Sequence, residues 1–557
     1  MRSGCLLTAS QKEFTKRIEE ASSAGAAMLE TLTPLVYRAS ILVYNKSHVP
    51  AIIHFSRTNE KDLGETAHEV LKELSTHNPE VFKTHIKELC EALESEAPTS
   101  DKPNGPGAVN DLKACAGFAQ KYPKEIPKDR KFVQSMLNFA LHGSPPKAAK
   151  YGVSVIMVTT DKKEMYAKDI LQRCTKNFEY GAGNYLARLA ALSQLVLVAA
   201  KEIEDDIDSI MDIAIDRVLL NPQAIPDRDE TDGAKEPDWA DDPDDDCVAK
   251  TWALKILVNR LRSCGEQESV EEIAKPIYAL LNGLIAKQGE LSTKKQSPKA
   301  HQSRLRLLAA QLLLKLSTDR RFDALLTAKD FNQLATVAQD SLQNVRSGFV
   351  NKLMKYLSQN RLSKRYYTII FLLAYEPAET LKESAATWIR ARSAAFARQK
   401  DPAMEALFAR FLSLLAHHPD FYRDPDPDKD VDNLKDYVQY IMFYLKCVAT
   451  EENLSLIYHV AQRVKSIQDG IDPTTSENLY FLSDLAQEVV RRYEEVHGWS
   501  MQAWPGKLRM PSGLFAALPN HEVAQEIAMK QYVPEALLDQ LDYLVRKSLK
   551  TNKVRAI

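Results

Sequence analysis

The sequence predicts an all-α protein, a HEAT-repeat α-solenoid of roughly nine to ten helical pairs. Apolar residues recur at helical spacing along most of the 557 residues, whereas few segments alternate as strands do. Gly is scarce, at 19 residues, and most of the breaks between helical segments are short. The chain is also longer than a single ordinary core allows, which favours a stack of repeats over one compact bundle.

The clearest repeat unit covers residues 301–357. An almost entirely apolar helix is expected at 301–316, a short amphipathic helix at 330–339, and a third helix at 341–357. Asp340 lies in the turn before the third helix, and Arg346 follows six residues later. In HEAT-type units such an Asp caps the second helix, while the Arg reaches polar groups of a neighbouring repeat.

The same periodicity recurs on both sides of this unit. Before it, helices are expected at 32–44, 49–57, 60–77, 78–95, 109–123, 129–143, 145–160, 162–178, 183–200, 203–220, 247–263 and 269–289. After it, they are expected at 364–377, 379–399, 402–419, 431–450, 453–468 and 476–498. No segment from 12 to 498 reads as a strand, so we expect no sheet.

Charge and composition divide the chain into four parts. Residues 227–246 hold eleven acids and two bases, a local net charge of −9 that leaves +7 for the rest of the chain. We expect 227–246 to be a disordered acidic loop outside the fold, between helical parts at 1–226 and 247–498. Residues 499–557 have no period at first and predict an irregular strap that ends in a basic helix. The first helices are no more polar than internal ones, so we expect the array to begin inside a longer one.

The composition is that of an ordinary soluble protein, with 45% hydrophobic and 27% charged residues. Seven scattered cysteines without a Cys-x-x-Cys pair are typical of reduced, buried side chains in an intracellular protein. No apolar run is long enough to span a membrane, and we expect no membrane partner.

Candidate catalytic and metal sites are weak. The acidic run after Asp424 has Lys429 where a calcium loop needs Gly, and Lys435 where it needs Glu. His417 and His418 are adjacent, so their side chains point apart on a helix. Cys447 lies in an aromatic run and is expected in the core. No phosphate-binding loop or nucleophile motif is present, so the sequence predicts a protein without enzymatic activity, catalytic residues, metal ligands or a required cofactor.

Basic residues around the central unit are the candidate binding site. Arg304, Arg306, Arg346, Lys352 and Lys355 are expected to line a groove for an acidic peptide or a polyphosphate. The alternative is a solvated helix face whose Arg side chains pair locally with acids and carbonyls.

A candidate phosphorylation site lies in the loop before the 301–316 helix. Ser297 precedes a proline in a segment that reads as flexible and basic, which suits a proline-directed kinase.

Several long blocks carry a family resemblance. They include "STHNPEVFKTHIKELCEALE", "LKACAGFAQKYPKEIPKDRKFVQSMLNFALHGSPPKAAKYGV", "ALKILVNRLRS", "HQSRLRLLAAQLLLKL", "FLSLLAHHPDF" and "ATEENLSLIYHVAQRVK". From about residue 10 to about residue 535, the chain resembles the cohesin-regulator family named for precocious dissociation of sisters, and its fungal members most of all.

The resemblance implies a function and a set of partners. Family members are HEAT-repeat scaffolds that bind the kleisin subunit of cohesin, cooperate with the releasing factor Wapl, and promote the action of the cohesin acetyltransferase. They maintain and release sister chromatid cohesion in the nucleus, and they reach chromatin through cohesin. One member binds inositol hexakisphosphate, which suits the basic groove. The Wapl-binding surface of the family is expected to lie in repeats that this chain lacks.

Two alternatives come from other classes of protein. A generic HEAT adaptor, such as a transport receptor or phosphatase scaffold, fits the periodicity but not the quoted blocks. A DNA-binding repeat protein predicts a concentrated basic stripe, which a charge of +7 spread over many helices does not suggest.

Overall fold

The computed structural model describes residues 48–550, apart from 59–62, 65, 68–69, 72–73, 75–78, 106, 222–236, 266–269, 292–296, 425–426, 507–509 and 512. The helices expected at 32–44 and 60–77, and the basic end of the chain, therefore lie wholly or largely outside the described residues.

The part before the acidic segment is helical. Its elements are α3 (Val49–Thr58), η3 (Pro79–Phe82), α5 (Ile86–Ser95), α6 (Ala108–Lys121), η4 (Pro123–Glu125), α7 (Arg130–His142), α8 (Lys147–Thr159), α9 (Lys163–Thr175), α10 (Tyr185–Val198), η5 (Lys201–Asp206), α11 (Ile207–Asp212) and η6 (Ile213–Leu219). The helix expected at 203–220 is thus divided into three elements, and the last of them, η6, is a π-helix.

The central part contains α12 (Asp245–Ser263), α13 (Glu271–Ala286), α14 (Lys299–Leu316), α15 (Arg320–Leu325), α16 (Ala328–Thr336), η8 (Val337–Gln339), α17 (Gln343–Ser358), η9 (Lys364–Tyr366), α18 (Tyr367–Ile370), η10 (Phe371–Tyr375), α19 (Glu379–Arg398) and α20 (Ala403–Ala416). The last part contains α21 (Pro427–Val448), α22 (Leu454–Val464), β1 (Ile467–Asp469), η11 (Pro473–Thr475), α23 (Ser476–His497), β2 (Phe515–Ala517), α24 (His521–Met529) and α25 (Glu535–Lys550).

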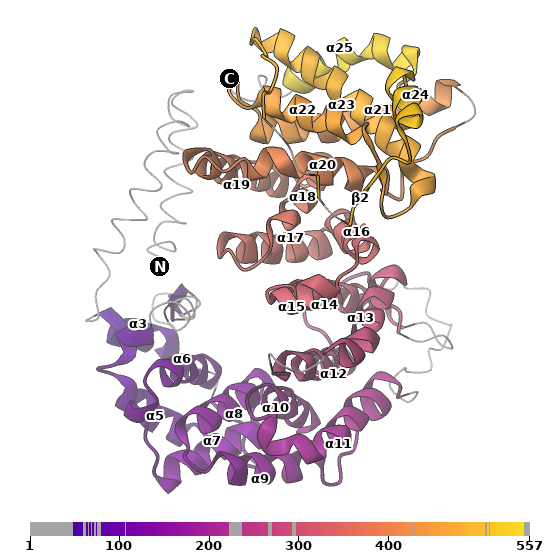
Figure 1. Cartoon of the computed structure of the whole chain (residues 1–557). Helices are drawn as coiled ribbons and strands as arrows, with labels where there is room; N and C mark the ends of the chain where they lie inside the picture. Colours follow the sequence, from indigo (N-terminus) through magenta and orange to yellow (C-terminus); the bar gives the residue numbers. More distant parts are fainter. Residues whose placement is uncertain are drawn as a thin grey trace.

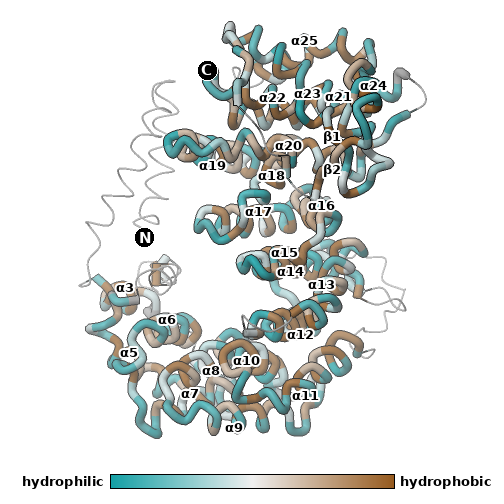
Figure 2. Tube along the Cα trace, in the orientation of Figure 1, coloured by the Kyte–Doolittle hydropathy of each residue, from teal (hydrophilic) through white to brown (hydrophobic). Residues whose placement is uncertain are grey.

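The helices stack as an α-solenoid, which confirms the predicted fold class. Figure 1 shows the chain following a strongly curved path, with α6, α8, α10, α12, α14 and α17 along its inner side and α7, α9, α11 and α13 outside them. Contacts join α6 to α8, α8 to α10, α10 to α12, α12 to α14 and α14 to α17, so the inner helices form a continuous layer. One hydrophobic core runs from Val49 to Val545 between the layers. Hydrophobic residues gather where helices face one another, as Figure 2 shows.

Side-chain caps fix where several helices begin. The Asp129 carboxylate accepts the backbone N–H groups of Lys131 and Phe132 at the start of α7, both at 3.0 Å. The Thr327 hydroxyl accepts the N–H of Asp330 at the start of α16. Each cap satisfies backbone donors that have no partner within the helix, so the short polar breaks read from the sequence become fixed turns.

The prediction that the chain contains no sheet is wrong, because one two-stranded sheet is present. β1 and β2 pair antiparallel, with Gln468 opposite Ala516, and they tie the segment after α23 back to the end of α22. The pairing is too short and too far apart in sequence to leave an alternating pattern. The segment after Trp499 therefore holds a strand and two helices, α24 and α25, where an irregular strap with one helix was expected.

The acidic segment was expected to lie outside the fold, and the described residues 237–246 do not. The Trp239 ring lies under the Arg304 guanidinium, 4.5 Å from its centroid. Asp244 accepts from His301 at 2.8 Å and caps α12. These residues pack on the fold through aromatic stacking and helix capping, two interactions that an acidic composition does not indicate.

Among the described residues, no helix is both long and apolar enough to cross a membrane.

Candidate functional site

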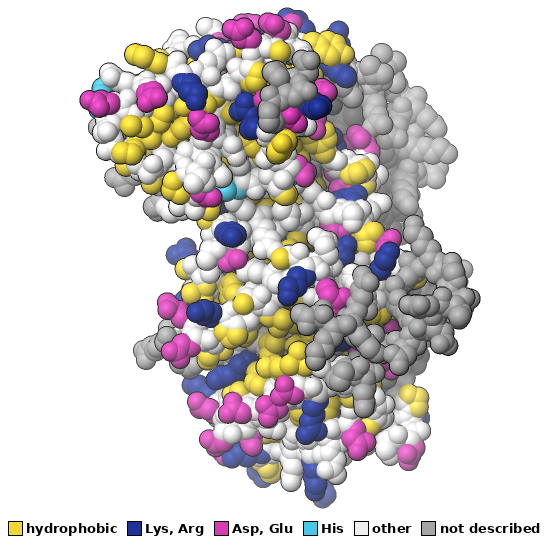
Figure 3. All heavy atoms as spheres, turned by 90° about the vertical axis from the view of Figure 1, so that its right-hand side faces the viewer, with side chains coloured by type: hydrophobic (Ala, Val, Ile, Leu, Met, Phe, Trp, Pro, Cys, Tyr) yellow, Lys and Arg dark blue, Asp and Glu magenta, His cyan; other side chains and the backbone are white. Residues whose placement is uncertain are grey.

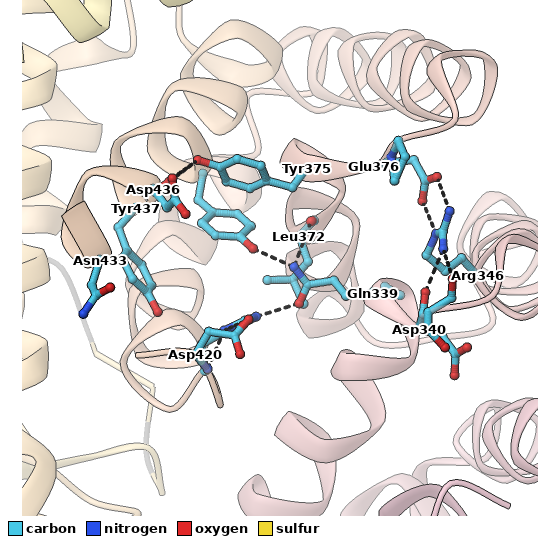
Figure 4. Close-up of a pocket in the computed structure, with 15 residues that line it drawn as sticks. Gln339, Asp340, Arg346, Leu372, Tyr375, Glu376, Asp420, Asn433, Asp436 and Tyr437 are labelled. Atoms are coloured by element: carbon cyan, nitrogen blue, oxygen red, sulfur yellow. Dashed lines mark hydrogen bonds and ion pairs between the residues drawn. The ribbon is translucent and has the colours of Figure 1, made fainter. Parts of the chain in front are cut away.

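A chain of buried ion pairs joins consecutive layers at the centre of the solenoid. Arg306 on α14 binds the Asp340 carboxylate through Nε at 2.6 Å and through its NH2 group at 2.8 Å. Arg346 on α17 binds the Glu376 carboxylate in the same two-pronged way, at 2.7 and 2.9 Å. Arg346 also donates to the backbone oxygens of Asp340 and Ser341 at 2.7 and 3.1 Å (Figure 4).

These pairs correct part of the predicted groove. Arg306 and Arg346 are 6% and 7% exposed, and the Glu376 side chain is fully buried, so the guanidinium groups of both Arg residues are engaged inside the chain. The alternative of local pairing holds for both. The HEAT-type prediction is confirmed for Arg346, which reaches Glu376 of the next repeat. It is wrong for Asp340 as a helix cap, because α17 begins after Leu342 without a side-chain cap; Asp340 accepts the N–H of Leu342 and pairs with Arg306 instead.

Arg304 is also engaged within the chain. Its Nε donates to the backbone oxygen of Ala240 at 2.7 Å, its NH2 group donates to Ala240 and Asp241, and its plane lies over Trp239. Arg304 therefore anchors the end of the acidic segment, and it is not a free ligand-binding residue.

Ser297 does not lie in an open loop in the folded chain. It is 3% exposed, its backbone N–H donates to one oxygen of Glu290 at 2.7 Å, and its hydroxyl donates to the other at 2.7 Å. A phosphate there would face a carboxylate at hydrogen-bond distance, which disfavours phosphorylation of the folded protein.

Lys352 and Lys355 are the predicted site residues that remain available. Lys355 is exposed and Lys352 is half-buried on α17, and neither has an acidic partner within ion-pair distance in the described part of the chain. Lys352 lies over the Tyr356 ring, 5.0 Å from its centroid. It belongs to a larger group of cations that the structure brings together.

We call this group the inner basic cluster. Its members come from four helices of the inner layer: Lys147 and Lys150 on α8, Lys255 and Arg262 on α12, Lys315 on α14, and Lys352 on α17. The lysines of this cluster have no ion pair among the described residues, and Arg262 donates only to the amide oxygen of Asn259, at 3.0 Å. Cations of four helices are thus close enough to repel one another.

Burial and the repulsion of neighbouring cations lower the pKa values of Lys150, Lys255 and Lys315. The pKa of Lys255 falls to about 7, chiefly through burial and then through the charges of Lys150, Lys147 and Lys352. The pKa of Lys315 also falls to about 7, through burial and the neighbouring cations. The same causes lower the pKa of Lys150. The free protein therefore holds these groups at a cost, which an anion would offset.

Aromatic rings accompany the cations. Lys255 lies 4.1 Å from the Trp252 centroid, and Lys150 lies 5.4 Å from that of Tyr151. These rings hold the ammonium groups in place without neutralising them. By contrast, the side of the molecule drawn in Figure 3 mixes basic and acidic side chains with no such concentration of one sign.

Sequence reasoning identified only Lys352 of this cluster. The others are dispersed over two hundred residues, and no local pattern joins them. A signal was present, however, because Lys255 and Lys315 each interrupt an apolar run, "ALKILV" and "LLLKL", where a lysine has to be half-buried.

The other candidates have structural roles. His418 donates through Nε2 to the Gln339 amide oxygen at 2.6 Å, and His417 lies 3.2 Å from the buried Asp469 carboxylate. No group of three or more metal-ligating side chains occurs among the described residues. Cys447 is buried and its pKa is raised by burial to about 12, which confirms the core assignment and makes it a poor nucleophile.

Comparison with known proteins gives one consistent result. The model of the family described as "Sister chromatid cohesion protein PDS5 protein" matches residues 6–516. The sister chromatid cohesion protein pds5 of Schizosaccharomyces pombe is 28% identical over 538 residues, 96% of this chain and 43% of that protein. PDS5 of Saccharomyces cerevisiae is 25% identical over 573 residues, 95% of this chain and 44% of that protein. Human PDS5 homolog A is 26% identical over 443 residues, 76% of this chain and 32% of that protein. The chain thus spans less than half the length of these relatives.

Proposed function

Because the chain belongs to the PDS5 family of sister chromatid cohesion proteins, we propose that it is a non-enzymatic scaffold that binds the kleisin subunit of cohesin. Through the kleisin it acts in the maintenance and release of sister chromatid cohesion, associated with chromosomes in the nucleus. The match over nearly the whole chain supports this proposal. The repeat architecture suits it as well, because a solenoid offers a long curved surface to an extended partner segment.

The inner basic cluster is the proposed anion site of this scaffold. The observation that carries it is the meeting of unpaired lysines from α8, α12, α14 and α17, two of them with pKa values near 7. Half-buried cations without carboxylates recognise closely spaced anionic groups. Inositol hexakisphosphate is one such ligand, and an acidic stretch of the kleisin is another.

Two further partners follow from family membership. We include the releasing factor Wapl and the cohesin acetyltransferase in the proposal. Each is tested by co-precipitation with the 557-residue chain alone and with the chain bound to kleisin.

Kleisin binding is tested directly by a pull-down of recombinant kleisin with the full 557-residue chain. Saturable retention is expected. Its absence, with a chain that gives a cooperative melting curve, overturns the scaffold proposal and leaves the anion site to be judged separately.

The anion site is tested by titrating inositol hexakisphosphate into the wild type and into a Lys255→Met, Lys315→Met double variant. The affinity of the variant is expected to fall at least tenfold, which corresponds to ~1.4 kcal/mol. The matched control is Lys128→Met with Lys168→Met, which removes the same charge from two surface ion pairs, with Asp161 and Glu164. Equal losses in both variants contradict a specific site.

Duplex DNA is the competing anion, and the same variants distinguish it. A DNA-binding face predicts affinity that falls steeply with salt and depends on many cations together. If the double variant loses DNA binding and keeps inositol hexakisphosphate binding, the cluster is a DNA contact and the proposed ligand is wrong.

A further inference from the structure

A second hollow lies beside the buried ion pairs and has the opposite charge. It is a cavity of ≈ 420 Å³ between η8, the end of η10 and α21. Figure 4 shows Gln339 and Leu372 on one side of it, with Tyr375, Asp436 and Tyr437 on the other and Asp420 at its edge.

The lining carries two carboxylates that form no ion pair with a Lys or Arg side chain among the described residues. The carboxylate of Asp436 accepts only the Tyr375 hydroxyl, at 2.9 Å, and Asp420 is 3.8 Å from the Nδ1 of His418. Arg346 is the one Lys or Arg of the lining, and Glu376 already binds it in two places. The lining of the hollow therefore carries more negative than positive charge.

His418 does not supply the missing positive charge. Its Nδ1 accepts the backbone N–H of Asp420 at 3.2 Å, and its Nε2 lies 2.6 Å from the Gln339 amide oxygen. An Nδ1 that accepts carries no proton, so the ring is neutral. Burial lowers the pKa of His418, which keeps it in this form at neutral pH.

Tyrosine rings and an unused hydroxyl complete the lining. Tyr375, Tyr437 and Tyr440 form a group, with the Tyr375 and Tyr440 centroids 5.1 Å apart and those of Tyr437 and Tyr440 5.9 Å apart. Tyr437 is 2% exposed, and its hydroxyl has no hydrogen-bond partner among the described residues. In Figure 4 that hydroxyl points toward Asp420. A buried hydroxyl without a partner costs stability unless a ligand satisfies it.

We propose that this hollow receives an arginine side chain from a partner protein. A planar guanidinium donates to carboxylates and phenol oxygens in fixed directions and stacks on tyrosine faces, whereas an ammonium does only part of this. Asp420 and Asp436 accept its N–H groups, the Tyr437 oxygen gains a donor, and the rings cover its faces. The inference does not depend on the anion site of the inner basic cluster, and it holds whether or not that cluster binds an anion.

The experiment uses the full 557-residue chain and three small probes, argininamide, lysinamide and citrullinamide, followed by saturation-transfer NMR. Citrullinamide has nearly the shape of argininamide, but its side chain ends in a neutral urea in place of the charged guanidinium. Argininamide is expected to bind saturably and with the highest affinity of the three probes. Lysinamide is expected to bind more weakly, and citrullinamide is expected to give no saturation-transfer signal. Asp436→Asn is expected to weaken argininamide about tenfold, which corresponds to ~1.4 kcal/mol, and Tyr437→Phe less.

The matched control is Asp432→Asn on the same helix, because Asp432 pairs with Lys435 and does not line the hollow. The melting temperature is measured for each variant, and Asp436 is exposed, so its substitution leaves the fold intact. The proposal is overturned if argininamide does not bind, if citrullinamide binds as well as argininamide, or if Asp436→Asn and Asp432→Asn have the same effect. Equal binding of lysinamide overturns the choice of arginine.

Discussion

Anion binding at the inner basic cluster should be coupled to proton uptake. In the free protein the pKa values of Lys255 and Lys315 are about 7, against an ordinary value near 10. An anion that joins the cluster removes the repulsion and restores the charged form, so each pKa should rise toward its ordinary range. A ligand that binds above pH 7 therefore takes protons from solution into the protein.

The magnitude follows from those pKa values. At pH 8 a lysine with a pKa of about 7 is only ~0.1 protonated, and one near its ordinary pKa is almost fully protonated. Two such lysines predict uptake of roughly one to two protons at pH 8, falling toward zero by about pH 6. The same pKa values fix the sign of the contribution that these two lysines make to stability. The unfolded state keeps their protons up to about pH 10, so their contribution to the stability of the unliganded protein should rise with pH between about 7 and 10.

Calorimetry measures this uptake as the dependence of the binding enthalpy on the ionisation enthalpy of the buffer. Inositol hexakissulfate is a suitable probe because its charges do not titrate near pH 8. The Lys255→Met, Lys315→Met variant should lose both affinity and uptake, while its melting temperature at pH 7 rises or stays level, because two strained charges have gone. Binding without proton uptake at pH 8 refutes the reasoning, as does the same uptake in the variant.

Three more outcomes are expected. Replacing Arg346 by Leu leaves the fully buried Glu376 carboxylate without its Arg partner, so the free energy of unfolding should fall by ~3–5 kcal/mol. Urea unfolding and hydrogen exchange in α17 measure this loss, and a loss under ~1 kcal/mol contradicts the buried pair. Trp239→Ala should lower stability by about 1 kcal/mol and speed proteolysis of the acidic segment, because the ring stacks on Arg304; unchanged cleavage means that the segment does not pack. Ser297→Asp should destabilise by about 1–3 kcal/mol, since it places a carboxylate against Glu290, whereas Ser297→Ala costs less; equal melting temperatures for the two contradict this.

The fold was largely predictable because each helix carries its own apolar period. The helices around α14 and α17 were recognised from spacing alone, and the Asp340–Arg346 pattern indicated how adjacent repeats are joined. What failed was non-local or too short to show a period. The β1–β2 pair joins residues some fifty positions apart, and η6 breaks a helix whose apolar pattern continues through it.

The site was less predictable for a related physical reason. A charged residue on a helix reads as solvent-facing, yet Arg306 and Arg346 find carboxylates in the next layer and become buried. Lys255 and Lys315 look like isolated interruptions of apolar runs, and only the stacking of α12 on α14 brings them to one place. Neither the burial of these Arg residues nor the proximity of these lysines depends on the sequence of a single helix. A single sequence therefore identifies the charged residues but not the residues that they contact.

The difference between paired Arg side chains and unpaired lysines decides which substitutions can test the proposed binding function. Charge reversal at Arg346 would place a carboxylate against the buried Glu376 carboxylate, so lost binding would only report lost packing. Lys255 and Lys315 are the informative pair, because no carboxylate of the described residues pairs with them and a methionine keeps their apolar stems. In a solenoid each layer packs against its neighbours, and Arg residues paired across layers stabilise that packing. Lysines that form no such pair are therefore the cations that can bind a ligand. A variant with lower affinity for the anion and an unchanged melting temperature distinguishes a ligand-binding charge from a structural one.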